Sequence, residues 1–167
     1  EPTMVNTKQA QRRDLKFNSI DDLSAELDRI QHAHDAGTLS TTGNWSPGQN
    51  LQHLAIVWKA GIDGFPPEMK PPFFIKWPAR WMFKKRATAG ETAPAGIKLP
   101  KQASKIIPVN QVAFDQGMRQ FREQIARTTG GERFAAHSPI FGDMTHEQWT
   151  NLQLGHCQLH LGFLQPG

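Results

Sequence analysis

Four long segments of this chain repeat apolar residues at the spacing of an α-helix, and this repetition constrains the fold more than any other feature. Residues three or four apart lie on one face of a helix, so each segment predicts a helix with a buried stripe. No segment alternates apolar and polar residues convincingly enough to predict a strand. We therefore predict an all-α bundle. The apolar positions are Ile20, Leu23, Leu27 and Ile30; Leu51, Leu54, Ala55, Trp58 and Ile62; Phe114, Met118, Phe121 and Ile125; and Trp149, Leu152, Leu159 and Phe163.

Capping side chains mark where these helices begin. Ser46, Pro47 and Gln49 form a capping box with proline at the first helical position, and Thr145 with Gln148 forms a second box. Such boxes satisfy backbone N–H groups that the first helical turn leaves unpaired. The remaining two helices are expected from Asn18 or Ser19 to Gly37, and from about Asn110 to Thr129.

The length of 167 residues favours one domain. We expect a polar lead-in over residues 1–17, frayed or draped on the surface, and a helical domain over 18–167. No uncharged apolar run approaches the roughly 20 residues that cross a bilayer. The single cysteine, Cys157, rules out an intrachain disulfide and a cysteine-only metal cluster, and is expected to be a small core residue. Any bound metal must therefore be held by His, Asp or Glu.

An excursion over residues 65–109 interrupts the helical pattern. It holds eight of the twelve prolines and two clusters of large apolar residues. We expect a short helix starting at Pro78, with Trp81 and Met82 inward and the basic run 84–86 outward. A lid that packs its aromatic side chains on the bundle is the preferred interpretation. A segment lying on a membrane surface is the alternative, because aromatic residues beside basic ones are typical of interfacial segments.

The basic charge of the chain is local. Nine Lys or Arg residues stand against two Glu between Pro66 and Pro108, whereas the rest of the chain has ten basic and thirteen acidic residues. No basic recognition helix accompanies this charge, so we expect no nucleic-acid partner. A local positive field instead favours an anionic small molecule. We expect a cytoplasmic protein, and the start at Glu1 without an initiator Met leaves export open.

Three histidines have the positions expected of metal ligands. His156 and His160 are four residues apart in the middle of an apolar stripe, so both imidazoles leave one helix face. His53 lies in a helix with apolar residues on both sides, which we expect to be central. Three separately hydrogen-bonded core histidines are the alternative to a shared ion. His32 and His34 lie at a helix C-terminus and are expected to be capping or surface residues.

Longer motifs resemble a known superfamily. The run Asn44-Trp45-Ser46-Pro47-Gly48-Gln49 before His53, the run from Ser138 to Thr145, and the His156/His160 pair are similar to those of the DinB/YfiT-like four-helix bundles. The resemblance covers nearly all the chain from about Leu15 and points to a bacterial branch of unknown function. It places the superfamily's metal ligands on His53, His156 and His160. Leu159 stands where the branch often has another histidine.

The resemblance implies a metal-dependent enzyme. Characterised members are transferases or isomerases that use low-molecular-weight thiols, or hydrolases, so the three histidines would hold a divalent ion, zinc or nickel, that activates a water or thiol. His137 is a secondary catalytic candidate, because the branch often has histidine before the last helix. The alternative is a non-enzymatic binding or stress-response bundle with a structural metal or none. Homodimerisation stays open.

Overall fold

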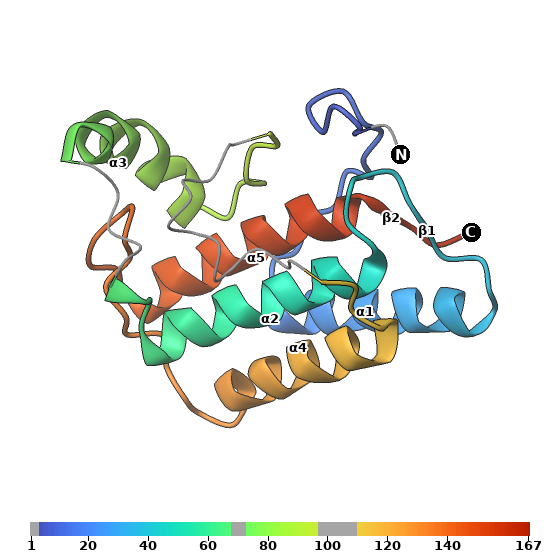
Figure 1. Ribbon diagram of the computed structural model, residues 1–167. Coiled ribbons are helices and arrows are strands. Elements are labelled where there is room, and N and C mark those ends of the chain that lie inside the picture. The colour runs from blue at the N-terminus through green and yellow to red at the C-terminus, as the bar shows by residue number, and fades with distance from the viewer. Residues whose placement is uncertain (1–3, 68–72, 97–109) are drawn as a thin grey trace.

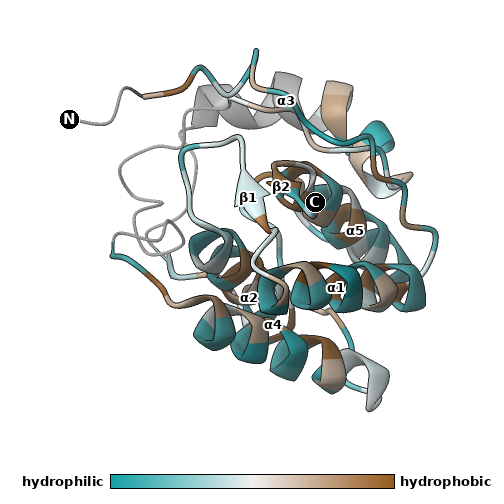
Figure 2. Ribbon diagram, turned by 90° about the vertical axis from the view of Figure 1, so that its right-hand side faces the viewer, coloured by the Kyte–Doolittle hydropathy of each residue, from teal (hydrophilic) through white to brown (hydrophobic). Residues whose placement is uncertain are grey.

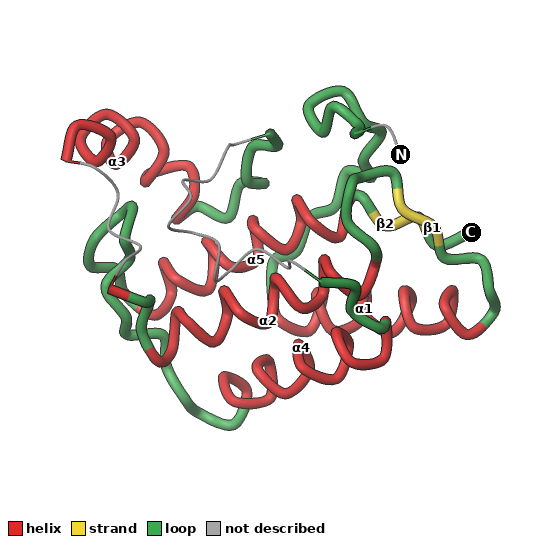
Figure 3. Tube along the Cα trace, in the orientation of Figure 1, coloured by secondary structure: helices red, strands yellow, loops and turns green. Residues whose placement is uncertain are grey.

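The structure, a computed structural model, describes residues 4–67, 73–96 and 110–167, with the backbone alone in 73–80 (Figure 1). These residues form five helices and one sheet of two short strands. The mostly helical class is as predicted, and the antiparallel pairing of Ser40–Thr41 with Leu164–Gln165 is an addition to it (Figure 3). In order, the elements are α1 (Ile20–Asp35), β1 (Ser40–Thr41), α2 (Pro47–Asp63), α3 (Phe73–Thr88), α4 (Phe114–Thr129), α5 (His146–Gly162) and β2 (Leu164–Gln165).

The capping side chains begin three helices where the sequence predicts. Ser19, Ser46 and Thr145 are the N-caps of α1, α2 and α5, and each forms a complete capping box. Ser19 rather than Asn18 caps α1. The helix α4 starts at Phe114, four residues after the expected Asn110, and its N-cap Ala113 makes no side-chain hydrogen bond. The first residue of α4, Phe114, is buried.

The helices α1, α2, α4 and α5 share one apolar core. Trp58, Phe121 and Trp149 are fully or almost fully buried, as predicted, and Leu152 packs against the core while partly buried. The helix α2 contacts both α4 and α5, which makes it central. In Figure 2 the outward sides of α1 and α4 are largely hydrophilic. The apolar stripes predicted for these four helices are thus the faces that pack against one another in the core.

Two glycines let α2 and α4 approach closely. A Cβ atom at Gly117 of α4 would lie 2.5 Å from the carbonyl oxygen of Gly48 in α2, and one at Gly48 would strike the carbonyl of Val112. Real Cβ atoms do not tolerate such distances, so any larger residue would push the two helices apart. This contact sets the position of the first turn of α2, and hence of the residues just after it.

The residues just before α1 contact both α1 and the end of α5. The backbone N–H of Arg13 donates to the carbonyl of Gly162, and its guanidinium donates to Glu26 at 2.6 Å and to the carbonyl of Leu164 at 2.6 Å. Phe17 is buried in the core. Residues 13–17 therefore tie α1 to the end of α5, although their sequence shows no periodic pattern.

The helix of the excursion differs from the expectation in both extent and orientation. It begins at Phe73 instead of Pro78. Trp81 is 84% exposed and Met82 is 61% exposed, so their expected inward placement is wrong. Lys84 takes the inward position instead, because its ammonium donates to the carbonyls of Phe141 and Asp143. The rest of the excursion, at 68–72 and 97–109, lies outside the described residues.

None of the described helices combines the length and the apolar character that a membrane span requires.

Candidate metal centre

Two neighbouring helices bring three imidazoles together. His53 lies in the second turn of α2, which Ser46 caps, and His156 and His160 lie one turn apart on α5. Because α2 packs against α5, the three rings meet between these helices. The ring centroids are 4.6–5.1 Å apart. Helical spacing predicts the pair on α5, whereas the meeting of that pair with His53, also a predicted candidate, depends on the tertiary contact of α2 with α5.

The distances suit one shared ion. Nε2 of His53 lies 3.2 Å from Nε2 of His156, and one ring nitrogen from each of the three histidines lies within 4.8 Å of the others. Two nitrogens bound to one tetrahedral zinc at 2.0–2.1 Å are about 3.4 Å apart. The pair between α2 and α5 is already close to that spacing, and no separation within the group exceeds 4.8 Å.

Burial disfavours the charged form of two of the three imidazoles. His53 is buried, and His156 and His160 are half-buried. Burial lowers the pKa of His156 to about 3, with a further contribution from the nearby His53. Burial also holds the pKa of His160 well below its ordinary value, and the two neighbouring rings act in the same direction. Neutral imidazole has the lone pair that metal ions bind, so the lowered pKa values of His156 and His160 favour the ligating form of these two rings.

Asn50 fixes the tautomer of His160. The side-chain N–H₂ of Asn50 donates to the carbonyls of Trp45 and Ser46, which leaves its Oδ1 as an acceptor. That oxygen lies 3.2 Å from Nδ1 of His160, so Nδ1 is the nitrogen that donates. Nε2 of His160 then keeps its lone pair. Metal-bound histidines are typically held in this way by a second residue.

Trp45 covers one side of the cluster. Its indole stacks on His160 with ring centroids 5.4 Å apart and an angle of 8° between the planes. It also lies 5.0 Å from the ring of His53 in a tilted arrangement. The half-buried indole therefore shields two of the three imidazoles from water on this side. Trp45 and Asn50 were not predicted, although both belong to the capped segment that leads to His53.

One nitrogen of the cluster lacks a hydrogen bond. Nδ1 of His156 is buried, and among the described residues it has no hydrogen-bond partner. Its Nε2 faces His53, so Nδ1 is unsatisfied whether or not it carries the proton. Leaving a buried polar group unpaired costs about 1–3 kcal/mol. The support that Asn50 gives His160 has no equivalent at His156.

The other candidate residues lie elsewhere. His137 is on the loop before α5, its Nδ1 is 2.7 Å from Oδ1 of Asp143, and its side chain is 67% exposed. It is not one of the three gathered histidines. His32 is exposed and His34 stacks on Phe114, in line with the surface role expected of them. Cys157 is fully buried, and burial raises the pKa of its thiol.

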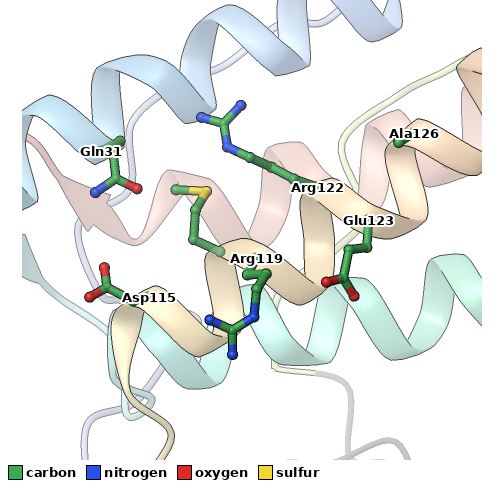
Figure 4. A pocket seen from close by; sticks show the side chains of 7 residues that line it. Gln31, Asp115, Arg119, Arg122, Glu123 and Ala126 are labelled. Atoms are coloured by element: carbon green, nitrogen blue, oxygen red, sulfur yellow. The ribbon is translucent and has the colours of Figure 1, made fainter.

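A separate open groove lies on the α1 and α4 side of the molecule. It has a volume of about 470 Å³, and Figure 4 shows Asp115, Arg119 and Glu123 along α4 beside it. Its charges are of both signs, and Arg122 is already paired with Asp28 at 2.7 Å. The groove is thus distinct from the histidine cluster. The described residues that line it are Gln31, Asp115, Met118, Arg119, Arg122, Glu123 and Ala126.

The fold and the cluster together define a mostly helical protein with a three-histidine group that could hold a metal ion. Residues 9–167 match the family described as "Protein of unknown function (DUF1569)", and the chain belongs to that family. Comparison with curated proteins and with solved structures gives no match. The family description gives no activity, so the function has to be argued from the site.

Proposed function

We propose that His53, His156 and His160 bind one divalent metal ion, zinc or nickel. The observation that carries the proposal is the convergence of three ring nitrogens within 4.8 Å, from two helices that pack together. Imidazole ligands suit both metals. The lowered pKa of His156 and the tautomer fixed by Asn50 present lone pairs to the ion without a prior loss of protons.

The proposal extends to a metal-dependent enzyme of the DinB/YfiT-like four-helix-bundle class, of the thiol-dependent transferase or hydrolase type. Three protein ligands leave a coordination position open, as catalytic zinc sites do. A bound ion would polarise a water or thiol at that position. His156 and His160 are half-buried, so small molecules can approach the cluster. The resemblance in the capped segment before His53 and in the residues before α5 supports the class.

The surrounding residues have distinct roles in this proposal. Asn50 orients His160, and the Trp45 indole excludes water from one side of the ligands. The net positive charge between Pro66 and Pro108 attracts an anionic substrate or an acidic thiol. His137 stays a secondary candidate for orienting substrate, and its partner Asp143 would fix its ring.

The alternative is a non-enzymatic binding or stress-response bundle, with a structural metal or none. A structural zinc site is normally closed by four protein ligands, whereas the group found among the described residues has three. The smaller number of protein ligands favours the enzyme. Whether a small molecule can occupy the remaining coordination position is therefore the measurement that separates the two roles.

The test uses full-length protein purified without a histidine tag. Metal analysis should find one zinc or nickel ion per chain, and Co²⁺ should replace it stoichiometrically. An open coordination position predicts that the visible spectrum of the Co²⁺ protein changes when a small thiol is added. If the spectrum does not change when the thiol is added, the metal has a structural role. Failure to bind any divalent ion above the level of His53→Ala would refute the metal centre itself.

A further inference from the structure

The helix α3 presents large apolar side chains to solvent. Trp81 is 84% exposed, Met82 is 61% exposed and Phe83 is 43% exposed. Among the described residues, no large apolar side chain is more exposed than Trp81. Consecutive residues of a helix point about 100° apart, so these three cover more than half of its circumference. At this turn the helix is therefore uncovered on most sides.

The described contacts between α3 and the body of the protein involve Lys84 and Thr88 of this helix. Lys84 donates to two carbonyls of the loop before α5, and Asn151 of α5 donates to the carbonyl of Thr88 at 2.9 Å. Figure 1 shows α3 lying outside the group formed by α1, α2, α4 and α5. These polar contacts fix the orientation of the helix. The outward placement of Trp81, Met82 and Phe83 is thus a property of the fold.

The charge of α3 identifies the surface that it fits. The sequence from Phe73 to Thr88 contains five Lys or Arg residues and no Asp or Glu. Lys85 is exposed beside the apolar residues, and Arg86 is exposed while paired with Glu91. Aromatic and basic side chains together are what a helix uses at the boundary between lipid headgroups and acyl chains. A nucleic acid would use the basic residues but give no reason for exposed Met82 and Phe83.

We propose that Trp81, Met82 and Phe83, with Lys85 and Arg86, dock α3 on the surface of an anionic phospholipid bilayer. The helix lies in the headgroup plane and does not cross the bilayer, in accord with the absence of any sufficiently long apolar helix among the described residues. A lid that packs its aromatic side chains on the bundle requires Trp81 to face the bundle. The exposure of Trp81 and Met82 argues against such packing and favours the membrane alternative.

The experiment measures sedimentation of the full chain with two kinds of vesicle. One is phosphatidylcholine alone, and the other is an equal mixture of phosphatidylcholine and phosphatidylglycerol. We expect binding at least about tenfold stronger to the mixture, weakened by salt. Trp81→Ser with Phe83→Ser, and separately Lys85→Glu with Arg86→Glu, should each reduce it by at least about tenfold. Melting curves check that these variants are folded.

Matched controls change equally exposed residues elsewhere. Met4→Ser removes an apolar side chain that is 81% exposed, and Arg29→Glu with Arg119→Glu reverses two exposed charges on α1 and α4. Both controls should bind the mixed vesicles as the unmodified chain does. Equal loss in the controls, or no binding to either vesicle, would overturn the proposal.

Two further results would assign α3 to another partner. If Trp81→Ser with Phe83→Ser converts a dimer into a monomer in sedimentation velocity, the occupant of this surface is a second copy of the chain. If duplex DNA binds more tightly than the vesicles, and only the charge reversal at Lys85 and Arg86 prevents it, the occupant is nucleic acid. Either result contradicts membrane docking.

Discussion

The helices α5 and α3 have nearly the same length but opposite surroundings. The sequence of α5 has a single Asp, Glu, Lys or Arg, Glu147, and the protein covers this helix on most sides. The sequence of α3 has five basic residues and seven large apolar ones, yet Trp81 and Met82 point to solvent. The number of large apolar residues does not decide which helix is buried. The charge that the helix carries matters as well, because a charged side chain has to reach water or a partner.

Buried polar residues complete the contrast. Gln153 and Gln158 of α5 are almost fully buried. The amide of Gln153 donates to the carbonyl of Val57 in α2, and Oε1 of Gln158 accepts the N–H of Phe17 at 2.8 Å. Satisfied amides of this kind can be buried at little cost. The helix that carries the histidines is thus held by polar contacts as well as by apolar ones.

The largest expected effect distinguishes a tryptophan of the core from a tryptophan of α3. Trp58→Ala should lower the free energy of unfolding by about 3–5 kcal/mol, because it opens a cavity between α2 and α4. Trp81→Ala should change it by less than about 0.5 kcal/mol, because its side chain is exposed. Urea denaturation followed by circular dichroism measures both values. Similar losses would show that α3 is part of the core.

The next effect concerns metal binding on α5. His156→Ala should weaken divalent-metal binding by more than about a hundredfold, because two imidazoles hold an ion far less tightly than three. His32→Ala changes an exposed histidine of α1 and should leave the affinity unaltered. Isothermal titration with Zn²⁺ compares the two variants. Equal affinities would mean that the gathered rings are not the ligands.

Acid should lower the free energy of unfolding of the metal-free protein through His156 of α5. The pKa of His156 is lowered from 6.5 to about 3 in the fold, so the unfolded chain takes up a proton first. The contribution of neutral His156 to the free energy of unfolding is therefore present above pH 6.5 and is lost as the pH falls toward 3. The loss between pH 7 and pH 5 is up to about 2 kcal/mol.

Denaturation at several pH values measures this slope, and His156→Gln is its control. Glutamine does not titrate, so the variant should lose part of the slope between pH 7 and pH 5. A slope that is unchanged in His156→Gln would place the acid-sensitive group elsewhere in the protein.

The smallest expected effect tests the residue that orients His160. Asn50→Ala should reduce metal affinity by about tenfold, the lower end of the range for partners of metal ligands. It should also alter the tautomer of His160, which ¹⁵N chemical shifts of the imidazole report. Asn50→Asp keeps the acceptor oxygen and should preserve the tautomer. If Asn50→Ala leaves those shifts unchanged, the 3.2 Å contact does not set the tautomer.

The sequence predicts local features of this protein better than its long-range ones. Capping boxes and apolar spacing locate α1, α2 and α5 because those signals lie within one turn of the residues that they specify. The contact of Asn50 with His160 joins positions far apart in the chain, and no periodic pattern in the sequence predicts it. The hydrogen bond from Arg13 to the carbonyl of Leu164 also joins residues far apart in the chain. The outward face of α3 depends on Lys84 reaching loop carbonyls, which helical spacing does not encode.

The indole that lies on the histidines gives the molecule an optical reporter of its own. Trp45 touches the rings of His53 and His160, whereas Trp58 and Trp149 are enclosed in the core. An ion arriving at the cluster changes the electrostatic environment of Trp45 first, and its fluorescence should respond. Comparison with Trp45→Phe would isolate that share of the emission. The arrival and departure of a metal could then be followed in real time in unlabelled protein.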